Sequence, residues 1–214
     1  MLAVIKGDII ASRKLVNQEK WLSPLKDLFG QWGKSPKQWE IVWGDFFQLQ
    51  VDKPEEALWK AFQIKTLVKK IEPKEANRKT STIDVRMAIG IGEKEYSGKR
   101  ISESNGPAFI FAAEQFEKLK KERTNLAIQS LHPEFDGEIN LYLKLAGVFM
   151  DKWTVSSAKT VALALQYPKA TQEELGNLLH IKQSAVSGRW NRANVGNVLE
   201  IERVFREKLK NLRP

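Results

Sequence analysis

Residues 38–51, QWEIVWGDFFQLQV, indicate the fold of this chain most clearly. Two apolar and aromatic runs meet there at the dipeptide Gly44-Asp45. Two such runs joined by a glycine-containing dipeptide are typical of a tight β-hairpin. Gly44 can take the positive φ that the turn requires, and an aspartate tolerates the same turn. Asp45 is also an isolated carboxylate at the tip of an otherwise apolar hairpin. Its role is therefore either structural, as a turn former, or functional.

The first 130 residues alternate between predicted strands and helices. Each helix has apolar side chains at spacings of three and four, and each strand is a short apolar run. The order is strand, helix, hairpin, helix, strand, helix and strand, at residues 2–6, 21–32, 38–51, 57–71, 83–92, 107–119 and 126–129. This order contains the split βαβ arrangement of a ferredoxin-like, palm-like domain.

The second part of the chain has a different pattern. The periodicity breaks around residues 132–137, and from residue 139 onward it is helical. We therefore predict an α+β chain with a ferredoxin-like sheet domain at residues 1–131 and an all-α domain at residues 132–214. Residues 72–82 are polar and irregular, which predicts a surface loop.

A second isolated acid, Asp8, closes the first predicted strand. A palm-type domain places the end of its first strand beside the tip of its central hairpin, where Asp45 stands. Two carboxylates brought together there form a site for Mg²⁺ or Mn²⁺ and for the phosphates that these ions carry. The sequence therefore predicts a metal site at Asp8 and Asp45.

Composition excludes several classes of protein. The 214 residues include no cysteine and only two histidines, which argues against disulfides and against a cysteine- or histidine-ligated metal. No apolar run reaches the ~20 residues of a membrane span, and the start lacks the basic leader of a signal peptide. We expect a cytoplasmic protein that does not bind membranes.

The formal charge of +9 favours an anionic partner such as nucleic acid or nucleotide. Residues 151–214 hold 11 Lys and Arg against 6 Asp and Glu, giving +5, whereas residues 1–150 hold 24 against 20, giving +4. The last third of the chain is therefore the denser positive surface.

The clearest local motif lies at residues 171–193, TQEELGNLLHIKQSAVSGRWNRA. Thr171 and Glu174 predict a capping box at the start of a first helix. A short turn at residues 180–182 leads to a second helix. We expect its inward-facing side chains to be Ala185, Val186 and Trp190. Two short helices joined in this way form a helix-turn-helix, whose second helix enters the major groove of DNA.

This motif resembles the helix-turn-helix in the fourth region of bacterial sigma factors and of related regulators. The resemblance implies that DNA is contacted by the exposed side chains Lys182, Gln183, Ser184, Ser187, Arg189 and Arg192. Gln and Arg suit base edges, while Ser, Lys and a further Arg suit phosphates. The alternative is a three-helix bundle that binds protein. An apolar stripe at residues 198–212 either packs back on this bundle or pairs two chains as a homodimer.

Several spaced motifs also recur in order along residues 1–130: Gly7-Asp8-Ile9 with Ser12-Arg13, Gly44-Asp45 with Phe47-Gln48, Asp84-Val85-Arg86 with the following AIGIG, and Ile101-Ser102-Glu103-Ser104 with Gly106. In this combination they resemble the SatD family of bacterial proteins. The family name by itself implies little about function.

The same landmarks are similar to those of class III nucleotidyl cyclases, in which acids after the first strand and at the hairpin hold metal ions on a nucleoside triphosphate. The resemblance implies Mg²⁺ or Mn²⁺ bound by Asp8, the carbonyl of Ile9, and Asp45. It also implies a nucleotide held by Ile10, Ala11, Ser12, Arg13 and Arg86. The backbone amides of residues 10–12 would open a helix and contact phosphates, and the two arginines would add positive charge.

One segment departs from the cyclase pattern. Where cyclases carry an Asn and an Arg on the helix after the glycine-containing strand, this chain has Ile110 and Glu114. If the likeness holds, both side chains face the cleft of Asp8 and Asp45. An acid at a position where a cation offsets phosphate charge opposes catalysis.

These observations predict a cytoplasmic DNA-binding regulator whose palm-like domain binds a nucleotide, with a metal, without conventional cyclase turnover. The alternative is a divergent metal-dependent nucleotidyl cyclase or nucleotidyltransferase whose helical domain serves oligomerisation or targeting. A third reading is an interaction module in which both sites are vestigial.

Overall fold

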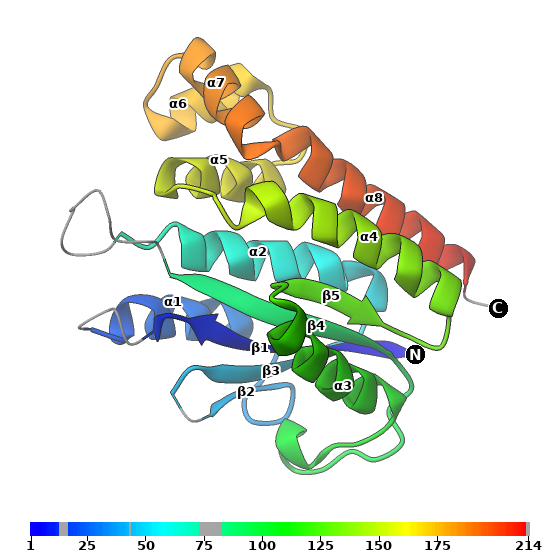
Figure 1. The fold of residues 1–214 in the computed structure, drawn as a ribbon. Coiled ribbons are helices and arrows are strands. Elements are labelled where there is room, and N and C mark those ends of the chain that lie inside the picture. The colour runs from blue at the N-terminus through cyan, green and yellow to red at the C-terminus, as the bar shows by residue number, and fades with distance from the viewer. Residues whose placement is uncertain (13–16, 43, 73–82, 213–214) are drawn as a thin grey trace.

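The computed structural model describes residues 1–12, 17–42, 44–72 and 83–212. This part of the chain has an α+β fold with one five-stranded mixed sheet and eight α-helices (Figure 1). The strands are β1 (Leu2–Ile10), β2 (Trp39–Val42), β3 (Phe46–Val51), β4 (Asp84–Gly92) and β5 (Leu126–Gln129). Their order is β2-β3-β1-β4-β5, and only β5 runs parallel to its neighbour.

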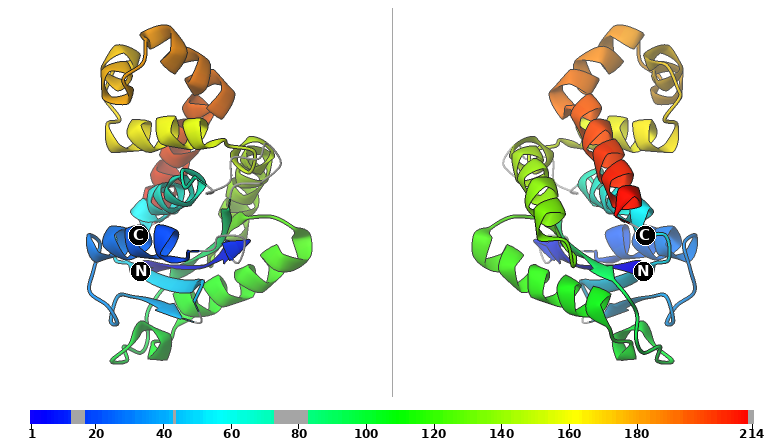
Figure 2. Two further views of the ribbon diagram at one scale, coloured as in Figure 1. Left: turned by 90° about the vertical axis from the view of Figure 1, so that its left-hand side faces the viewer. Right: turned by 90° about the vertical axis from the view of Figure 1, so that its right-hand side faces the viewer.

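Three helices flank the sheet, namely α1 (Glu19–Gly30), α2 (Ala57–Lys69) and α3 (Pro107–Glu122). Helices α1 and α2 cover one face and α3 covers the other (Figure 2). The alternation of side chains along β1 explains this arrangement, because Ala3 and Ile5 pack with α1 and α2 whereas Val4 packs with α3. The predicted order of elements from residue 2 to residue 129 is confirmed.

The predicted hairpin is also confirmed. Strands β2 and β3 pair in antiparallel register around the turn, and Gly44 has a φ of +88°. This positive φ is the property for which glycine is favoured at the turn. The loop predicted at residues 72–82 lies outside the described residues, except for Glu72.

Strand β1 is longer than predicted. The sequence pattern ended it at residue 6, but it continues through Gly7 and Asp8 to Ile10, paired with β3 on one side and β4 on the other. Glycine fits at position 7 because a Cβ there would lie 2.7 Å from the carbonyl oxygen of Arg86. Asp8 is therefore a residue within the strand and does not close it.

Two glycines of β4 let α3 pack directly on the sheet. A Cβ at Gly90 would overlap the backbone of Ala108 and Ala112, and a Cβ at Gly92 would lie 2.9 Å from the backbone nitrogen of Ala108. The backbones of β4 and α3 therefore approach more closely than any side chain at these positions would allow.

Five helices follow the sheet: α4 (Pro133–Met150), α5 (Val155–Gln166), α6 (Gln172–Leu179), α7 (Gln183–Ala193) and α8 (Val195–Asn211). Helices α4, α5 and α8 pack above α2 and share one continuous hydrophobic core with it (Figure 1). The boundary near residue 132 stays a prediction, but the apolar side chains on its two sides belong to the same core. No helix in the described part is long and apolar enough to cross a membrane.

Helix α4 also covers the outer edge of β5. The side-chain amide of Asn140 accepts a hydrogen bond from the Ile128 N–H at 2.8 Å and donates one to the Ile128 carbonyl at 2.9 Å. The apolar stripe of the last helix packs back on the protein, since Val198, Phe205 and Leu209 are fully buried. The first of the two alternatives for that stripe is therefore the one observed.

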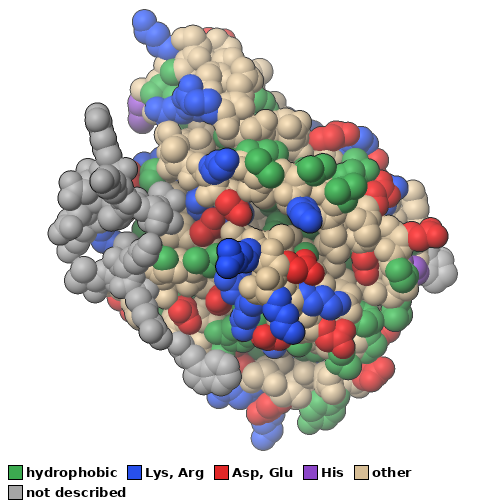
Figure 3. Space-filling view, viewed as in Figure 1, with side chains coloured by type: hydrophobic (Ala, Val, Ile, Leu, Met, Phe, Trp, Pro, Cys, Tyr) green, Lys and Arg blue, Asp and Glu red, His purple; other side chains and the backbone are tan. Residues whose placement is uncertain are grey.

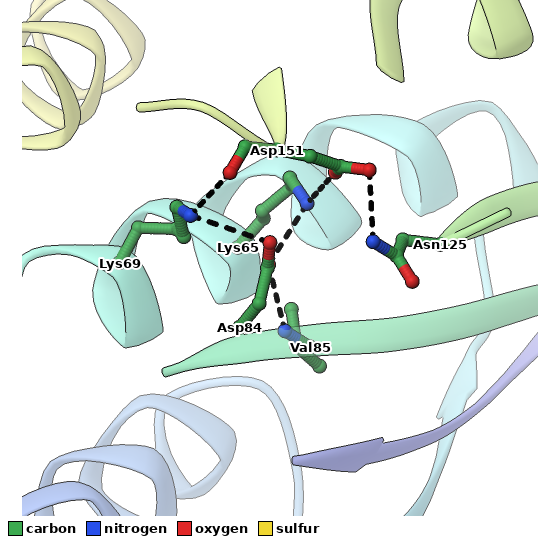
Figure 4. A network of polar contacts seen from close by, with 6 residues as sticks. All are labelled: Lys65, Lys69, Asp84, Val85, Asn125 and Asp151. Carbon is green, nitrogen blue, oxygen red and sulfur yellow. Dashed lines mark hydrogen bonds and ion pairs between the residues drawn. The ribbon is translucent and has the colours of Figure 1, made fainter. Parts of the chain in front are cut away.

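A buried ion-pair network joins the sheet, α2 and the α4–α5 junction (Figure 4). Lys65 of α2 contacts Asp84 at 2.9 Å and Asp151 at 2.7 Å, and it is fully buried. Lys69 contacts the second oxygen of Asp84 and the Asp151 carbonyl. Asn125 donates to the remaining Asp151 oxygen at 2.8 Å. Each charged group thus has a partner of opposite charge, which offsets the cost of its burial.

Candidate functional site

The candidate site is centred on Asp8, whose Cα pairs with Phe46 of β3 and with Arg86 of β4. Side chains alternate across a strand, so Asp8 lies on the same face as Val4 and Lys6, the face that α3 covers. Its carboxylate is half-buried, and its Oδ2 lies 3.7 Å from an Arg86 Nη1. Asp8 thus lies on β1, with β3 and β4 on its two sides and the end of α3 over its face.

Asp45 lies next to this strand at the hairpin turn. The Ile9 N–H donates to the Asp45 carbonyl at 3.1 Å, which fixes the hairpin tip beside β1. The buried Ser12 hydroxyl donates to the Asp45 Oδ2 at 2.8 Å. The expected proximity of the first strand to the hairpin tip is therefore observed, and Ser12 orients the second carboxylate.

Two polar atoms in the site are buried without a hydrogen-bond partner in the described part of the chain. They are the Asp8 Oδ1 and the Arg86 Nε, which belong to neighbouring side chains. Buried polar atoms in folded proteins are nearly always paired, so these two atoms call for partners such as water, an ion or a ligand.

Sequence reasoning missed two cations near Asp8. Lys6 lies two residues earlier on the same face of β1, with its ammonium over the ring of Phe46. Lys120 belongs to the last turn of α3, where it contacts Glu117 at 2.9 Å. Basic and acidic side chains gather over α3 in Figure 3. The spacing of Lys6 and Asp8 was a readable signal, whereas the approach of Lys120 depends on how α3 packs.

The ionisation of Asp8 reflects this environment. Burial raises the pKa of the Asp8 carboxyl above its ordinary value, Arg86 and Lys120 lower it, and Asp45 raises it again. Burial also lowers the pKa of the Lys6 ammonium, with Glu117 and Lys120 acting in opposite directions. Asp45 and Lys120 therefore both lie within electrostatic reach of Asp8, although they come from distant parts of the sequence.

The ligand predicted for this site is a hard divalent cation that carries a phosphate. Among the described residues, no group of three or more His, Cys, Asp or Glu gathers around one point. A cation at Asp8 and Asp45 would therefore take further ligands from the Ile9 carbonyl, water or phosphate oxygens, as Mg²⁺ usually does. The unpaired Asp8 Oδ1 is a free acceptor for such a cation, and Arg86 and Lys120 supply positive charge beside it.

The segment that follows Asp8 differs from the expected phosphate-binding helix. Residue Ile10 ends β1, Ala11 has a φ of +61°, and α1 begins only at Glu19. Ser12 begins a 3-10 turn whose continuation lies outside the described residues, so the contact of the amides of residues 10–12 with a nucleotide stays a prediction. Arg13 lies outside the described residues.

Glu114 does not join the site. Its carboxylate accepts a hydrogen bond from Gln129 at the far end of β5, and both Glu114 and Ile110 are exposed. Gln129 pairs with Gly90, which is level with Val4 and well along the strands from Asp8. The expectation that Ile110 and Glu114 face the Asp8 cleft is therefore wrong, because α3 presents Glu117 and Lys120 there instead.

The second candidate site is formed by α6 and α7. Thr171 and Glu174 form the predicted capping box, with the Glu174 N–H donating to the Thr171 hydroxyl at 3.2 Å. The turn between α6 and α7 is tight. A Cβ on Gly176 would lie 2.8 Å from the carbonyl oxygen of Ile181, and the Ile181 N–H donates to the Gly176 carbonyl. His180 takes a positive φ of +54° at this point.

Helix α7 presents the predicted side chains to solvent with two differences. Lys182, Gln183, Ser184 and Arg192 are exposed, whereas Ser187 and Arg189 are partly buried. Val186 is fully buried as expected, and Trp190 packs against the core. Ala185 was expected to face inward and is exposed, because the face of α7 that packs against the protein is narrower than the pattern suggested.

In comparisons with known proteins, no family model matches the chain and no curated protein is found to be similar. The resemblances to the SatD family, to the cyclases and to sigma factors therefore stay predictions. What the chain does has to be argued from these two sites.

Proposed function

We propose that the chain is a DNA-binding regulator whose sheet domain binds a nucleotide together with a divalent cation. The observation that carries DNA binding is α7, a short helix that follows a tight three-residue turn and exposes Lys182, Gln183 and Ser184 at its start. In helix-turn-helix proteins the N-terminal residues of the second helix contact base edges. Gln183 also donates to Gln172 at the start of α6, which holds the two helix N-termini together.

The cation and nucleotide part of the proposal rests on the Asp8 site. Asp8 of β1 lies within electrostatic reach of Arg86 of β4, Lys120 of α3 and Asp45 of the hairpin. The order of β2, β3, β1 and β4, each antiparallel to its neighbours, supports the ferredoxin-like, palm-like part of the proposal. When bound, the cation would neutralise phosphate charge, and Lys6, Arg86 and Lys120 would orient the phosphates.

The DNA-binding prediction is tested with Arg189→Ala combined with Arg192→Ala. We expect weaker binding to a mixture of double-stranded DNA sequences. We also expect the slope of log affinity against log salt to flatten by ~2, because two phosphate contacts are lost. Fluorescence anisotropy across a salt series measures both quantities.

The matched control is Arg203→Ala with Lys210→Ala, which removes the same charge from exposed positions of α8. Equal loss of affinity in the two double variants would assign the binding to net charge and remove α7 from the interface. Unchanged affinity and slope in the α7 variant would do the same.

The cation prediction is tested by thermal shift and calorimetry with each nucleoside triphosphate, with and without Mg²⁺ or Mn²⁺. We expect nucleotide binding that requires the metal in the unaltered chain and is lost in Asp8→Asn and Asp45→Asn. Asp27→Asn, an exposed acid on α1, is the control and should bind as the unaltered chain does. Metal-independent binding, or binding that survives both site variants, would contradict the proposed site.

The same incubations separate a sensor from an enzyme. The proposal is binding without turnover, and Glu114, which accepts a hydrogen bond from Gln129, takes no part in it. Chromatography should therefore recover the triphosphate unchanged. A cyclic or oligomeric nucleotide product would establish the alternative, a divergent nucleotidyl cyclase or nucleotidyltransferase.

A further inference from the structure

Helix α4 is apolar on two opposite faces. Its inner face is buried in the core through Phe135, Ile139 and Leu143, among others. Its outer face exposes Leu141, Leu145 and Val148, whose side chains are 54%, 60% and 63% accessible. Residues at spacings of four and three form one stripe along a helix. A surface helix normally turns polar side chains outward, so a continuous apolar stripe of this kind marks an interaction surface.

A groove continues this stripe toward α8. A cavity of about 390 Å³ lies between the two helices, and its walls include Leu145, Phe149 and Val204. Hydrophobic side chains gather over this part of the molecule in Figure 3, where Figure 1 shows α4 and α8 side by side. Leu145 belongs to both the stripe and the groove wall, so the two form one apolar surface.

The charges around the stripe are arranged by sign along α4. Glu134 and Glu138 lie near its N-terminus, while Lys144 and Lys152 lie in and just beyond its second half. Glu134 and Lys152 are exposed, and neither has an ion-pair partner within the described part of the chain. The surface therefore has an apolar centre with acid at one end and base at the other.

We propose that this surface binds a second copy of the chain, with the two α4 helices antiparallel and related by a two-fold axis that crosses the outer face at the level of Leu143. In that register Leu141 faces the partner's Leu145, and Glu134 faces the partner's Lys152. Val148 faces the partner's Glu138, which is already paired with Lys208 of its own chain. At 1.5 Å per residue, Glu134 and Lys152 each lie about 13 Å from the axis, on opposite sides of it. A parallel pair would instead bring like charges together and align the two helix dipoles unfavourably.

A second copy of the chain fits this surface because the surface is complementary to itself. An isologous interface requires that one patch match itself after a half-turn, and the sequence of acid, leucine, leucine and base along α4 does so. The contact is a helix pair with an adjoining groove, so we expect a dimer of moderate strength, with a Kd on the order of 10 µM. This inference does not depend on DNA or nucleotide binding.

The first experiment is sedimentation equilibrium of the full chain. The unaltered protein should associate to twice the mass of the chain. Leu145→Asp should weaken association by at least about 100-fold, because two carboxylates would be buried near the axis. Leu178→Asp changes an equally exposed leucine on α6 and should associate as the unaltered chain does. A chain that stays monomeric, or a Leu145→Asp variant that still dimerises, would overturn the proposal.

The second experiment exchanges charges and is independent of how Leu145→Asp folds, since both positions are exposed. Glu134→Lys alone and Lys152→Glu alone should each weaken the dimer by roughly threefold to tenfold, because each places two pairs of like charges in contact. The double variant should recover the affinity of the unaltered chain. Equal weakening in the double and single variants would overturn the antiparallel register.

Discussion

At the scale of the residue, Asp8 is the group whose environment is most informative. It is a carboxylate that the strand pairs with an arginine, yet its net pKa is raised because burial outweighs the attraction of Arg86 and Lys120. Its Oδ1 has no partner in the described part of the chain. Burial makes the Asp8 carboxyl costly to ionise when no ligand is bound. An aspartate at this position is therefore better explained by ligand binding than by a contribution to stability.

The raised pKa makes the contribution of Asp8 to stability depend on pH. An acid whose folded pKa lies above its unfolded value of 3.8 contributes no penalty below pH 3.8 and destabilises the fold as pH rises through the folded pKa. Asp8→Asn should therefore be more stable than the unaltered chain at neutral pH, and the difference should disappear in acid. Urea unfolding at the two pH values measures it.

The control for this comparison is again Asp27→Asn, which should give little difference at either pH. A variant less stable than the unaltered chain at neutral pH would show that the pairing of Asp8 with Arg86 outweighs its burial.

At the scale of the element, most of the sheet domain is readable from the sequence. The hairpin, the helices and strand β5 follow from apolar spacing and turn residues. The length of β1 was missed because Gly7 and Asp8 interrupt its apolar run, although Gly7 is required there by the close approach of Arg86. The helix expected directly after Asp8 begins no earlier than residue 11, because β1 continues to Ile10.

The packing of α3 on β4 gives a prediction at this scale. Gly90→Ala would place a Cβ against the backbone of Ala108 and Ala112, which cannot move without displacing the helix. We expect a loss of about 1–3 kcal/mol in the free energy of unfolding. Gly30→Ala, where nothing lies within 4 Å, should be neutral or stabilising by up to about 1 kcal/mol. Similar values for both variants in urea titrations would show that α3 can move away.

At the scale of the whole molecule, the sequence could not reveal how the two parts join. Lys65 and Lys69 lie on a helix, where lysines usually indicate the solvent-facing side. Asp151, the partner of Lys65, is 86 residues away in the sequence. Pairing over such a distance leaves no local signal in the spacing. The buried network and the shared core therefore appear only in the folded structure.

This network predicts a large effect from a single substitution. Lys65→Met would leave Asp84 and Asp151 without the buried cation that bridges them, and we expect a loss of about 3 kcal/mol in the free energy of unfolding. Lys159→Met removes an exposed pair with Glu72 and should cost far less, because water screens that pair. Chemical denaturation measures both. If the two variants lost equal stability, the network would not be a structural link.

The amide of Asn140 has a consequence for how the protein behaves in a crowded solution. An open edge strand is a template on which a strand from another chain can grow into a fibril. By bonding to both the N–H and the carbonyl of Ile128, Asn140 occupies the groups that such a strand would need. One side chain of α4 thus makes β5 a poor seed for aggregation, while the same helix keeps its opposite face available for association of folded chains.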